Sequence, residues 1–135
     1  MSSSTTLLSV RFAETDQMGV AHHSSYVLWC EVGRVDWMKA HNMSYRSFEE
    51  DTGISLAVSE LKIKYRQGVS FDDELTIVTT LVQAKSRRFI FDYQISSGEK
   101  RIADAQSIHT PTNRQGQSVR MPQEWLELLA QHITV

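Results

Sequence analysis

A carboxylate and a glycine stand just before a long apolar segment near the start of the chain. Asp16 and Gly19 precede His22 and His23, and the apolar segment begins at about residue 25. If that segment is a helix, its first turn offers backbone N–H groups without intrahelical partners and the positive end of a dipole, which together can stabilise a developing oxyanion. Asp16 would then act as the neighbouring nucleophile or general base. The spacing therefore predicts a reaction site.

Each residue around Asp16 also allows a structural interpretation. Asp16 could cap the turn before Gly19 through its short side chain, and Gly19 is expected to supply a turn conformation that other residues rarely adopt. The His23 imidazole could hydrogen-bond a substrate or a water, or serve only local packing. His22 is interpreted as a pocket or surface residue.

Other catalytic arrangements fit the sequence less well. Asp16 with the adjacent His22 and His23 lacks the spaced, convergent geometry of zinc ligands, so we expect no metal. No serine stands in a Gly-x-Ser-x-Gly context, and neither a P-loop nor a dinucleotide-binding fingerprint occurs. We therefore expect no resident cofactor.

A strand and a helix are predicted on either side of the site loop. Leu8, Val10 and Phe12 alternate with polar residues, which is typical of a short strand with one buried face. Residues 25–40 are apolar around most of the helix circumference, which favours a helix buried on several sides.

Glu31, Gly33 and Arg34 are among the residues that interrupt the apolar character of this helix. Glu31 and Arg34, three residues apart, could form an ion pair. Gly33 costs about 1 kcal/mol of helix propensity but would let another backbone approach closely. We therefore expect packing, rather than propensity, to place the helix.

Further strands follow the helix. The alternation changes parity near Ser59-Glu60, which predicts a β-bulge there. The connections are short and turn-like, so an antiparallel meander is expected. Alternation of apolar and polar residues predicts strands over 54–65, 75–81, 89–95 and 102–109.

Two short helices complete the predicted elements. Ser47 and Glu50 fit a capping box and Gly53 fits a helix stop, which predicts a helix or turn over about 45–51. Pro122, placed at a first helical position and followed by apolar residues at helical spacing, predicts a short amphipathic helix that closes the domain.

The predicted fold class is α+β, with a curled antiparallel sheet of about five strands wrapped around one long central helix. Residues 1–135 are expected to form a single domain, because 135 residues that are 41% hydrophobic suffice for one core and not for two. Residues 1–6 are expected to be frayed. Ala103 and Ala105 would allow the helix to sit close to the last strand.

Composition narrows the range of partners and compartments. The chain has 16 acidic and 14 basic residues spread along its length, so no basic stripe predicts a nucleic-acid partner. No apolar run approaches the roughly 20 residues that span a bilayer. The single cysteine, Cys30, cannot form an internal disulfide, and a reducing compartment fits it best. We expect a soluble, cytoplasmic protein.

The motif Glu14-Thr15-Asp16-x-x-Gly19-Val20-x-x-His23-x-x-Tyr26, followed by Glu31-x-x-Arg34, resembles the hotdog-fold thioesterases of the 4-hydroxybenzoyl-CoA thioesterase type. The resemblance continues in Phe71-Asp72-Asp73-Glu74-Leu75 and Gly116-x-x-Val119-Arg120-x-Pro122. It implies a hotdog fold and an acyl-CoA thioesterase, with Asp16 as catalytic carboxylate and the backbone N–H of His23 facing the thioester carbonyl. Coenzyme A would enter as part of the substrate.

The resemblance also implies a homo-oligomer, either a dimer or a homotetramer built as a dimer of dimers, with the pocket between subunits. Tyr26 and Trp29 could line the acyl pocket, although aromatic residues on a buried helix often belong to the core. Basic residues in corresponding regions approach the CoA phosphates, but a solvated hairpin turn explains them equally well. The candidates here are Lys85, Arg87, Arg88 and Arg120.

The substrate stays open at this point. Aromatic acyl-CoAs such as 4-hydroxybenzoyl-CoA or a naphthoyl-CoA, short or medium aliphatic acyl-CoAs, and acyl-carrier-protein thioesters are all served by similar frameworks. A hotdog hydratase or dehydratase and a non-catalytic acyl-CoA-binding module are the alternatives from other classes. The fold by itself does not decide among them.

Overall fold

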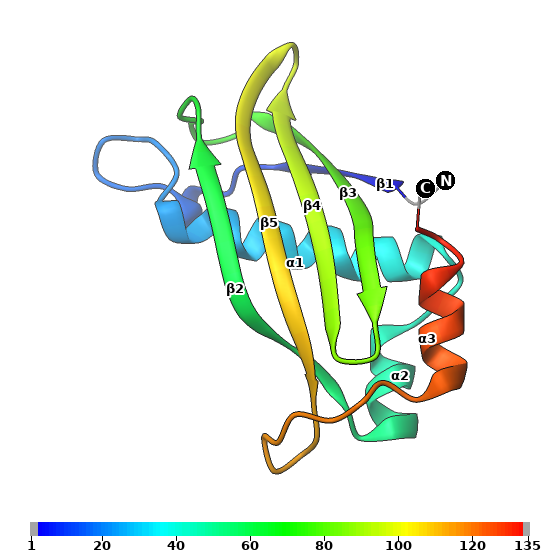
Figure 1. Ribbon diagram of the computed structural model, residues 1–135. Helices are drawn as coiled ribbons and strands as arrows, with labels where there is room; N and C mark the ends of the chain where they lie inside the picture. Colours follow the sequence, from blue (N-terminus) through cyan, green and yellow to red (C-terminus); the bar gives the residue numbers. More distant parts are fainter. Residues whose placement is uncertain (1–2, 134–135) are drawn as a thin grey trace.

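The long apolar segment forms helix α1 (His23–Ala40), which lies across one face of a curved five-stranded antiparallel sheet (Figure 1). This computed structural model describes residues 3–133. The predicted α+β class and curled antiparallel sheet are confirmed. The strands are β1 (Ser3–Ser9), β2 (Ser55–Tyr65), β3 (Glu74–Lys85), β4 (Arg88–Ser97) and β5 (Lys100–Thr112), in the spatial order β1-β3-β4-β5-β2.

Strand β1 begins earlier than the sequence predicted. It pairs antiparallel with β3, so that Ser3 lies opposite Thr80 and Ser9 lies opposite Glu74. The expectation that residues 1–6 are frayed is wrong for residues 3–6, because backbone pairing with β3 fixes them in the sheet. Residues 1 and 2 lie outside the described residues.

The chain leaves the sheet before Phe12. Leu8 is half-buried and Val10 is buried, as the alternation predicted. Phe12 was expected on the same buried face, but its side chain is 75% exposed and opens a short 3-10 helix, η1 (Phe12–Glu14). The strand ends here because the Arg11 N–H donates to the Glu14 carboxylate at 2.7 Å instead of to a neighbouring strand.

Strand β2 contains the predicted bulge. Its pairing with β5 shifts register between Val58 and Glu60. The Ser59 hydroxyl donates to the Ile108 carbonyl at 3.0 Å, which ties the bulge to β5. Apolar side chains of opposite parity on the two sides of the bulge can thereby face the same side of the sheet.

Helix α1 packs chiefly on β1 and β3. A Cβ atom at Gly33 would overlap Thr79 Oγ1 and lie 3.3 Å from Ile77 Cγ2, which confirms that Gly33 permits a close approach. This contact is over β3 and not at Ala103 and Ala105 of β5, where a close fit was expected.

One side of α1 is more exposed than its composition predicted. Trp29, Cys30 and Trp37 are fully buried against the sheet. The opposite side still carries apolar residues that are between 41% and 48% exposed, namely Val27, Leu28 and Val32. An apolar stripe on a helix therefore remains uncovered in the single chain.

Helix α2 (Tyr45–Thr52) lies where a short helix was predicted, but its cap is different. The N-cap is Ser44, whose hydroxyl accepts from the Ser47 N–H at 3.2 Å. The predicted capping box of Ser47 and Glu50 is wrong, because Ser47 already lies inside the first turn. Gly53 ends the helix with a φ of 68°, as predicted for a helix stop.

Helix α3 (Gln123–Ala130) packs against β3 and buries Leu129. Pro122 is its N-cap and not its first helical residue. Across residues 3–133, no helix combines the length and apolar character needed to cross a bilayer.

Candidate functional site

Asp16 lies in a short loop between η1 and α1 that is closed by its own backbone. The Asp16 N–H donates to the Val20 carbonyl at 2.8 Å, and the Gly19 N–H donates to the Asp16 carbonyl at 3.1 Å. An antiparallel bridge joins Thr15 to Ala21 at the base of the loop. Gly19 has a φ of 80°, the left-handed conformation expected of it. These bonds fix the conformation of the loop and thereby the position of Asp16.

The half-buried carboxylate of Asp16 uses one oxygen to hold this loop. Oδ1 accepts from the N–H of Met18 at 2.8 Å and from the N–H of Val20 at 3.3 Å. Within residues 3–133, Oδ2 has no hydrogen-bond partner. The turn-capping role and a catalytic role are thus compatible, because one oxygen orients the group while the other is available for chemistry.

Helix α1 starts beside this loop without a side-chain cap. The N-cap residue, His22, is exposed, and its N–H donates to the Glu14 carbonyl at 2.8 Å. The next two N–H groups, of His23 and Ser24, have no acceptor in the described part of the chain. Two donors at the positive end of the helix dipole can therefore receive a negative oxygen.

Tyr65, the last residue of β2, holds the His23 side chain. The two rings stack with centroids 4.0 Å apart and planes 16° apart, and Tyr65 Oη donates to the His23 carbonyl at 3.3 Å. Tyr26 packs edge-on against Tyr65. Sequence reasoning missed Tyr65, since the only signal was its place at the end of an alternating strand.

Glu14 belongs to the motif around Asp16, but sequence reasoning assigned it no role. Its carboxylate is buried and accepts hydrogen bonds from Arg11 and from the indole of Trp29. Burial acts to raise the pKa of Glu14, but these hydrogen bonds outweigh it and lower the pKa below its ordinary value. Glu14 is therefore ionised at neutral pH.

The structure places the two aromatic residues proposed for the acyl pocket in the core. Tyr26 is 2% exposed and Trp29 is 1% exposed. Neither lines the cavity that α1 does border, which lies further along the helix. The role of these two residues in an acyl pocket stays a prediction.

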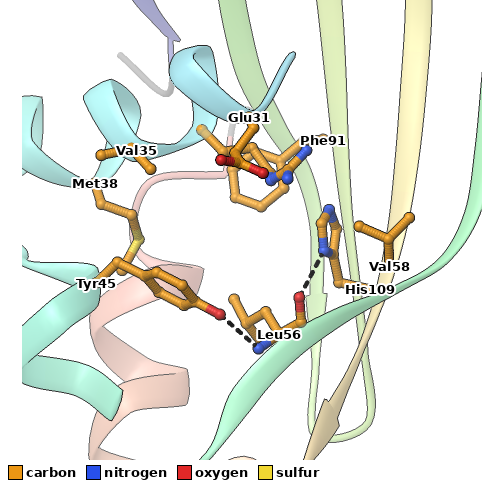
Figure 2. Close-up of a pocket in the computed structure, with 9 residues that line it drawn as sticks. Glu31, Val35, Met38, Tyr45, Leu56, Val58, Phe91 and His109 are labelled. Atoms are coloured by element: carbon orange, nitrogen blue, oxygen red, sulfur yellow. Dashed lines mark hydrogen bonds between the residues drawn. The ribbon is translucent and has the colours of Figure 1, made fainter. Parts of the chain in front are cut away.

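A cavity of about 360 Å³ opens between α1, α2 and the sheet (Figure 2). The first α1 residues that line the cavity are Glu31 and Arg34. At 1.5 Å per helical residue, they lie about 12–17 Å along α1 from His23. Most of the lining is apolar, and Glu31, Arg34, Tyr45 and His109 supply its charged or titratable groups. The lining residues are Glu31, Arg34, Val35, Met38, Tyr45, Leu56, Val58, Phe91 and His109.

A chain of hydrogen bonds runs from this cavity into the sheet. Arg34 Nη1 donates to Tyr93 Oη at 3.0 Å, Tyr93 Oη lies 2.6 Å from Ser107 Oγ, and Ser107 Oγ lies 2.7 Å from His109 Nε2. His109 Nδ1 lies 3.2 Å from the Leu56 carbonyl. A guanidinium only donates and a carbonyl only accepts, so the proton of His109 is on Nδ1 and every hydroxyl donates toward Leu56.

Burial favours the neutral forms of Tyr93 and His109 in this series of hydrogen bonds. It lowers the pKa of His109 to about 4, with the nearby Arg34 acting in the same direction, and it raises the pKa of Tyr93 to about 12. The predicted pair of Glu31 with Arg34 is not formed, since no ion pair among residues 3–133 joins them. Arg34 instead turns to Tyr93, a partner 59 residues away.

The four basic residues proposed for CoA phosphates are brought together at one end of the molecule. The β3–β4 hairpin meets the segment before α3 through the Met121 N–H, which donates to the Ser86 carbonyl at 2.6 Å. An Arg87 guanidinium N–H donates to Ser118 Oγ at 3.2 Å. The cluster is exposed and consists of Lys85, Arg87, Arg88 and Arg120.

This basic cluster is far from Asp16 within one chain. Because Ser9 lies opposite Glu74, the site loop that follows β1 is at the Glu74 end of β3. The cluster is at the Lys85 end, roughly 35 Å away at about 3.3 Å per strand residue. Figure 1 shows this separation between the β3–β4 hairpin and the loop before α1.

Metal-binding groups do not converge in the described part of the chain. No three His, Cys, Asp or Glu side chains of residues 3–133 lie in an arrangement that could hold an ion. The expectation that the protein uses no metal or resident cofactor stays a prediction.

Comparison with known sequences agrees with the motif around Asp16. Residues 10–129 match the thioesterase-like superfamily. The chain is 27% identical over 126 residues to the 1,4-dihydroxy-2-naphthoyl-CoA hydrolase of Synechococcus elongatus, covering 90% of this chain and 93% of that protein.

Comparison with solved structures agrees with the fold. The hypothetical protein TT1821 from Thermus thermophilus is 29% identical and superposes with a TM-score of 0.91 over 98% of this chain and 99% of that one. The 4-hydroxybenzoyl-CoA thioesterase of Pseudomonas sp. strain CBS-3, at 18% identity, shares the fold with a TM-score of 0.85 over 95% and 99% of the two chains. Since the sequence match spans almost all of its length, the chain belongs to the thioesterase-like superfamily and has the hotdog fold predicted from its motifs.

Proposed function

We propose that this chain is an acyl-CoA thioesterase that hydrolyses aromatic or short to medium acyl-CoA esters to the free acid and CoA. The observation that carries the proposal is the Asp16 carboxylate, held by one oxygen in a fixed loop beside a helix start at which two N–H groups have no acceptor among residues 3–133. The naphthoyl-CoA hydrolase activity named for a relative supports an aromatic acyl group.

In the proposed reaction, the thioester carbonyl oxygen binds the N–H groups of His23 and Ser24. These donors stabilise the negative charge that develops on that oxygen when the carbonyl carbon is attacked. Asp16 Oδ2 attacks directly, or it removes a proton from a water that attacks. The tetrahedral intermediate collapses and the CoA thiolate leaves; on the direct route, water then hydrolyses the mixed anhydride.

We further propose that two chains pair and that the substrate lies between them. Strand β2 is an edge of the sheet, with unpaired backbone groups and with Val58 49% and Tyr65 40% exposed. Pairing of two β2 strands would also cover the exposed apolar stripe of α1. A partner subunit can bring its basic cluster to the CoA phosphates, which the roughly 35 Å separation prevents within one chain.

In this arrangement the acyl group runs along α1 from His23 toward the cavity of Figure 2. The cavity is apolar enough for an acyl chain or a ring, and its polar side chains are those of Glu31, Arg34, Tyr45 and His109. Light scattering of the purified protein tests the pairing, and a monomeric enzyme with full activity would contradict it.

The decisive experiment follows thiol release from a panel of aromatic and aliphatic acyl-CoAs with wild type and Asp16→Asn. Asparagine keeps the oxygen that accepts from Met18 and Val20, so the loop should be retained while the nucleophile or base is lost. We expect turnover to fall by about 100-fold or more. Asp51→Asn, an exposed aspartate on α2, is the matched control and should be unaffected.

The other outcomes have different meanings. Full activity of Asp16→Asn would refute the mechanism. If thiol were released only from acyl-carrier-protein thioesters, these and not CoA esters would be the substrates, and hydration of an enoyl-CoA without thiol release would indicate a hydratase. If the protein bound acyl-CoA without any turnover, it would be a binding module.

A single turnover in ¹⁸O-labelled water, with enzyme in excess, tests the two roles of Asp16. If Asp16 is the nucleophile and water attacks the Asp16 carbonyl of the anhydride, the label enters the enzyme and not the acid. If Asp16 is a general base, the label enters the acid product.

A further inference from the structure

Glu14 binds both sides of the site loop through its side chain. The residue is only 5% exposed. Oε1 accepts from the Arg11 N–H at 2.7 Å, on the chain that enters the loop. Oε2 accepts from Trp29 Nε1 at 3.0 Å, on α1, and from Arg11 Nη2 at 3.2 Å. A single buried anion thus joins η1 to the helix.

The backbone of Glu14 adds two more connections to the helix start. Its carbonyl accepts from the His22 N–H at 2.8 Å and from Ser25 Oγ at 2.9 Å. Ser25 is buried, so this second bond is shielded from water. Together with the indole contact of Trp29, these bonds attach Glu14 to the first two turns of α1.

We propose that Glu14 is the residue that positions Asp16 against the start of α1. Asp16 follows Glu14 by two residues. The N–H groups of His23 and Ser24 directly follow His22, whose own N–H donates to the Glu14 carbonyl. A shift of η1 relative to α1 would therefore move the carboxylate away from the oxyanion donors. Misplacement by about 1 Å can cost roughly 100-fold in rate. This inference rests on the proposed function.

The chemistry of the site requires a carboxylate at position 14. Three N–H donors, two from Arg11 and one from Trp29, point at its two oxygens. Glutamine has nearly the same shape, but its amide offers a single acceptor oxygen and would place an NH₂ group against a donor. Glu14→Gln thus keeps the packing while it weakens the connection between η1 and α1.

The test compares kcat and KM for hydrolysis of an acyl-CoA that the wild type turns over. We expect Glu14→Gln to lower kcat by about 10- to 100-fold and to change KM less than about threefold, because the substrate contacts are retained while the reacting groups are misplaced. Trp29→Phe, which removes the indole donor together with part of a buried ring, should lower kcat less. The double variant should be no slower than Glu14→Gln, because both changes break one connection.

Glu50→Gln is the matched control. Glu50 pairs with Arg46 on the surface of α2, where its side chain is 63% exposed, so its kinetics should equal those of the wild type. Rates are expressed per folded molecule, measured by circular dichroism. A kcat per folded molecule equal to wild type in Glu14→Gln would overturn the proposal, as would a loss confined to KM.

Two further readouts separate this inference from the proposed function. If Asp16→Asn is inactive while Glu14→Gln is fully active, the positioning role fails and the thioesterase mechanism stands. If the wild type itself releases no thiol, the proposed function fails. Amide hydrogen exchange then decides the positioning role: the His22 N–H should exchange faster in Glu14→Gln, and unchanged exchange would overturn it.

Discussion

Acidification should destabilise the fold through His109. This histidine is 1% exposed, and burial lowers its pKa from 6.5 to about 4. Between these two pH values the unfolded chain binds a proton at His109 that the folded chain does not. The contribution of His109 to the free energy of unfolding is therefore fully present above about pH 6.5 and is lost as the pH falls toward 4. The shift corresponds to roughly 3 kcal/mol in total, of which roughly 2 kcal/mol is lost by pH 5.

The physical cause of this loss is the direction of the hydrogen-bond chain. His109 Nε2 accepts from the Ser107 hydroxyl, so a proton added at Nε2 would face another donor. Ser107 could turn only by releasing its bond with Tyr93, which already accepts from Arg34. The new imidazolium would also lie in the same buried region as the Arg34 cation.

Urea unfolding at pH 7.5 and pH 5 measures the effect in wild type and in His109→Gln. The variant has no titrating ring at this position. Between pH 7.5 and pH 5 its free energy of unfolding should therefore fall by roughly 2 kcal/mol less than that of the wild type. Carboxylates and other histidines contribute equally to both proteins, and exposed His22→Gln is the control that should behave as wild type. An identical loss in wild type and His109→Gln would refute the reasoning.

Two further predictions concern the contact of α1 with the sheet. Gly33→Ala gains about 1 kcal/mol of helix propensity, but its Cβ would overlap Thr79 Oγ1, and overpacking typically costs about 1–3 kcal/mol. Urea unfolding should show a net loss that Thr79→Ala partly restores, and a variant as stable as wild type would contradict the close approach. Cys30 is 0% exposed and burial raises its pKa to about 12, so a disulfide reagent should react only after denaturant is added; rapid reaction of the native protein would contradict this burial.

The sequence by itself determined the features that depend on neighbouring residues. Helix α1 was predicted over 25–40 and spans residues 23–40, because its apolar content extends over four turns. The bulge at Ser59-Glu60 followed from a change of parity, and Gly19 and Gly53 followed from the need for positive φ. The spacing of Asp16 from the helix start is likewise local, so the candidate site could be located before the structure.

Only the tertiary structure decided which distant groups meet. Arg34 is three residues from Glu31 but donates to Tyr93, because packing of α1 on the sheet offers a buried hydroxyl. Helix α2 shows the same limit at short range: the sequence predicted Ser47 as its cap, and the backbone path placed the cap at Ser44.

Glu14 shows the limit at the site itself. The motif placed it two residues before Asp16, but its contact with the Trp29 indole spans 15 residues and requires η1 to lie against α1. Position along the chain does not specify such contacts. The hydrogen-bond partners of a buried polar group depend on which groups the packing of helices and strands brings within hydrogen-bond distance.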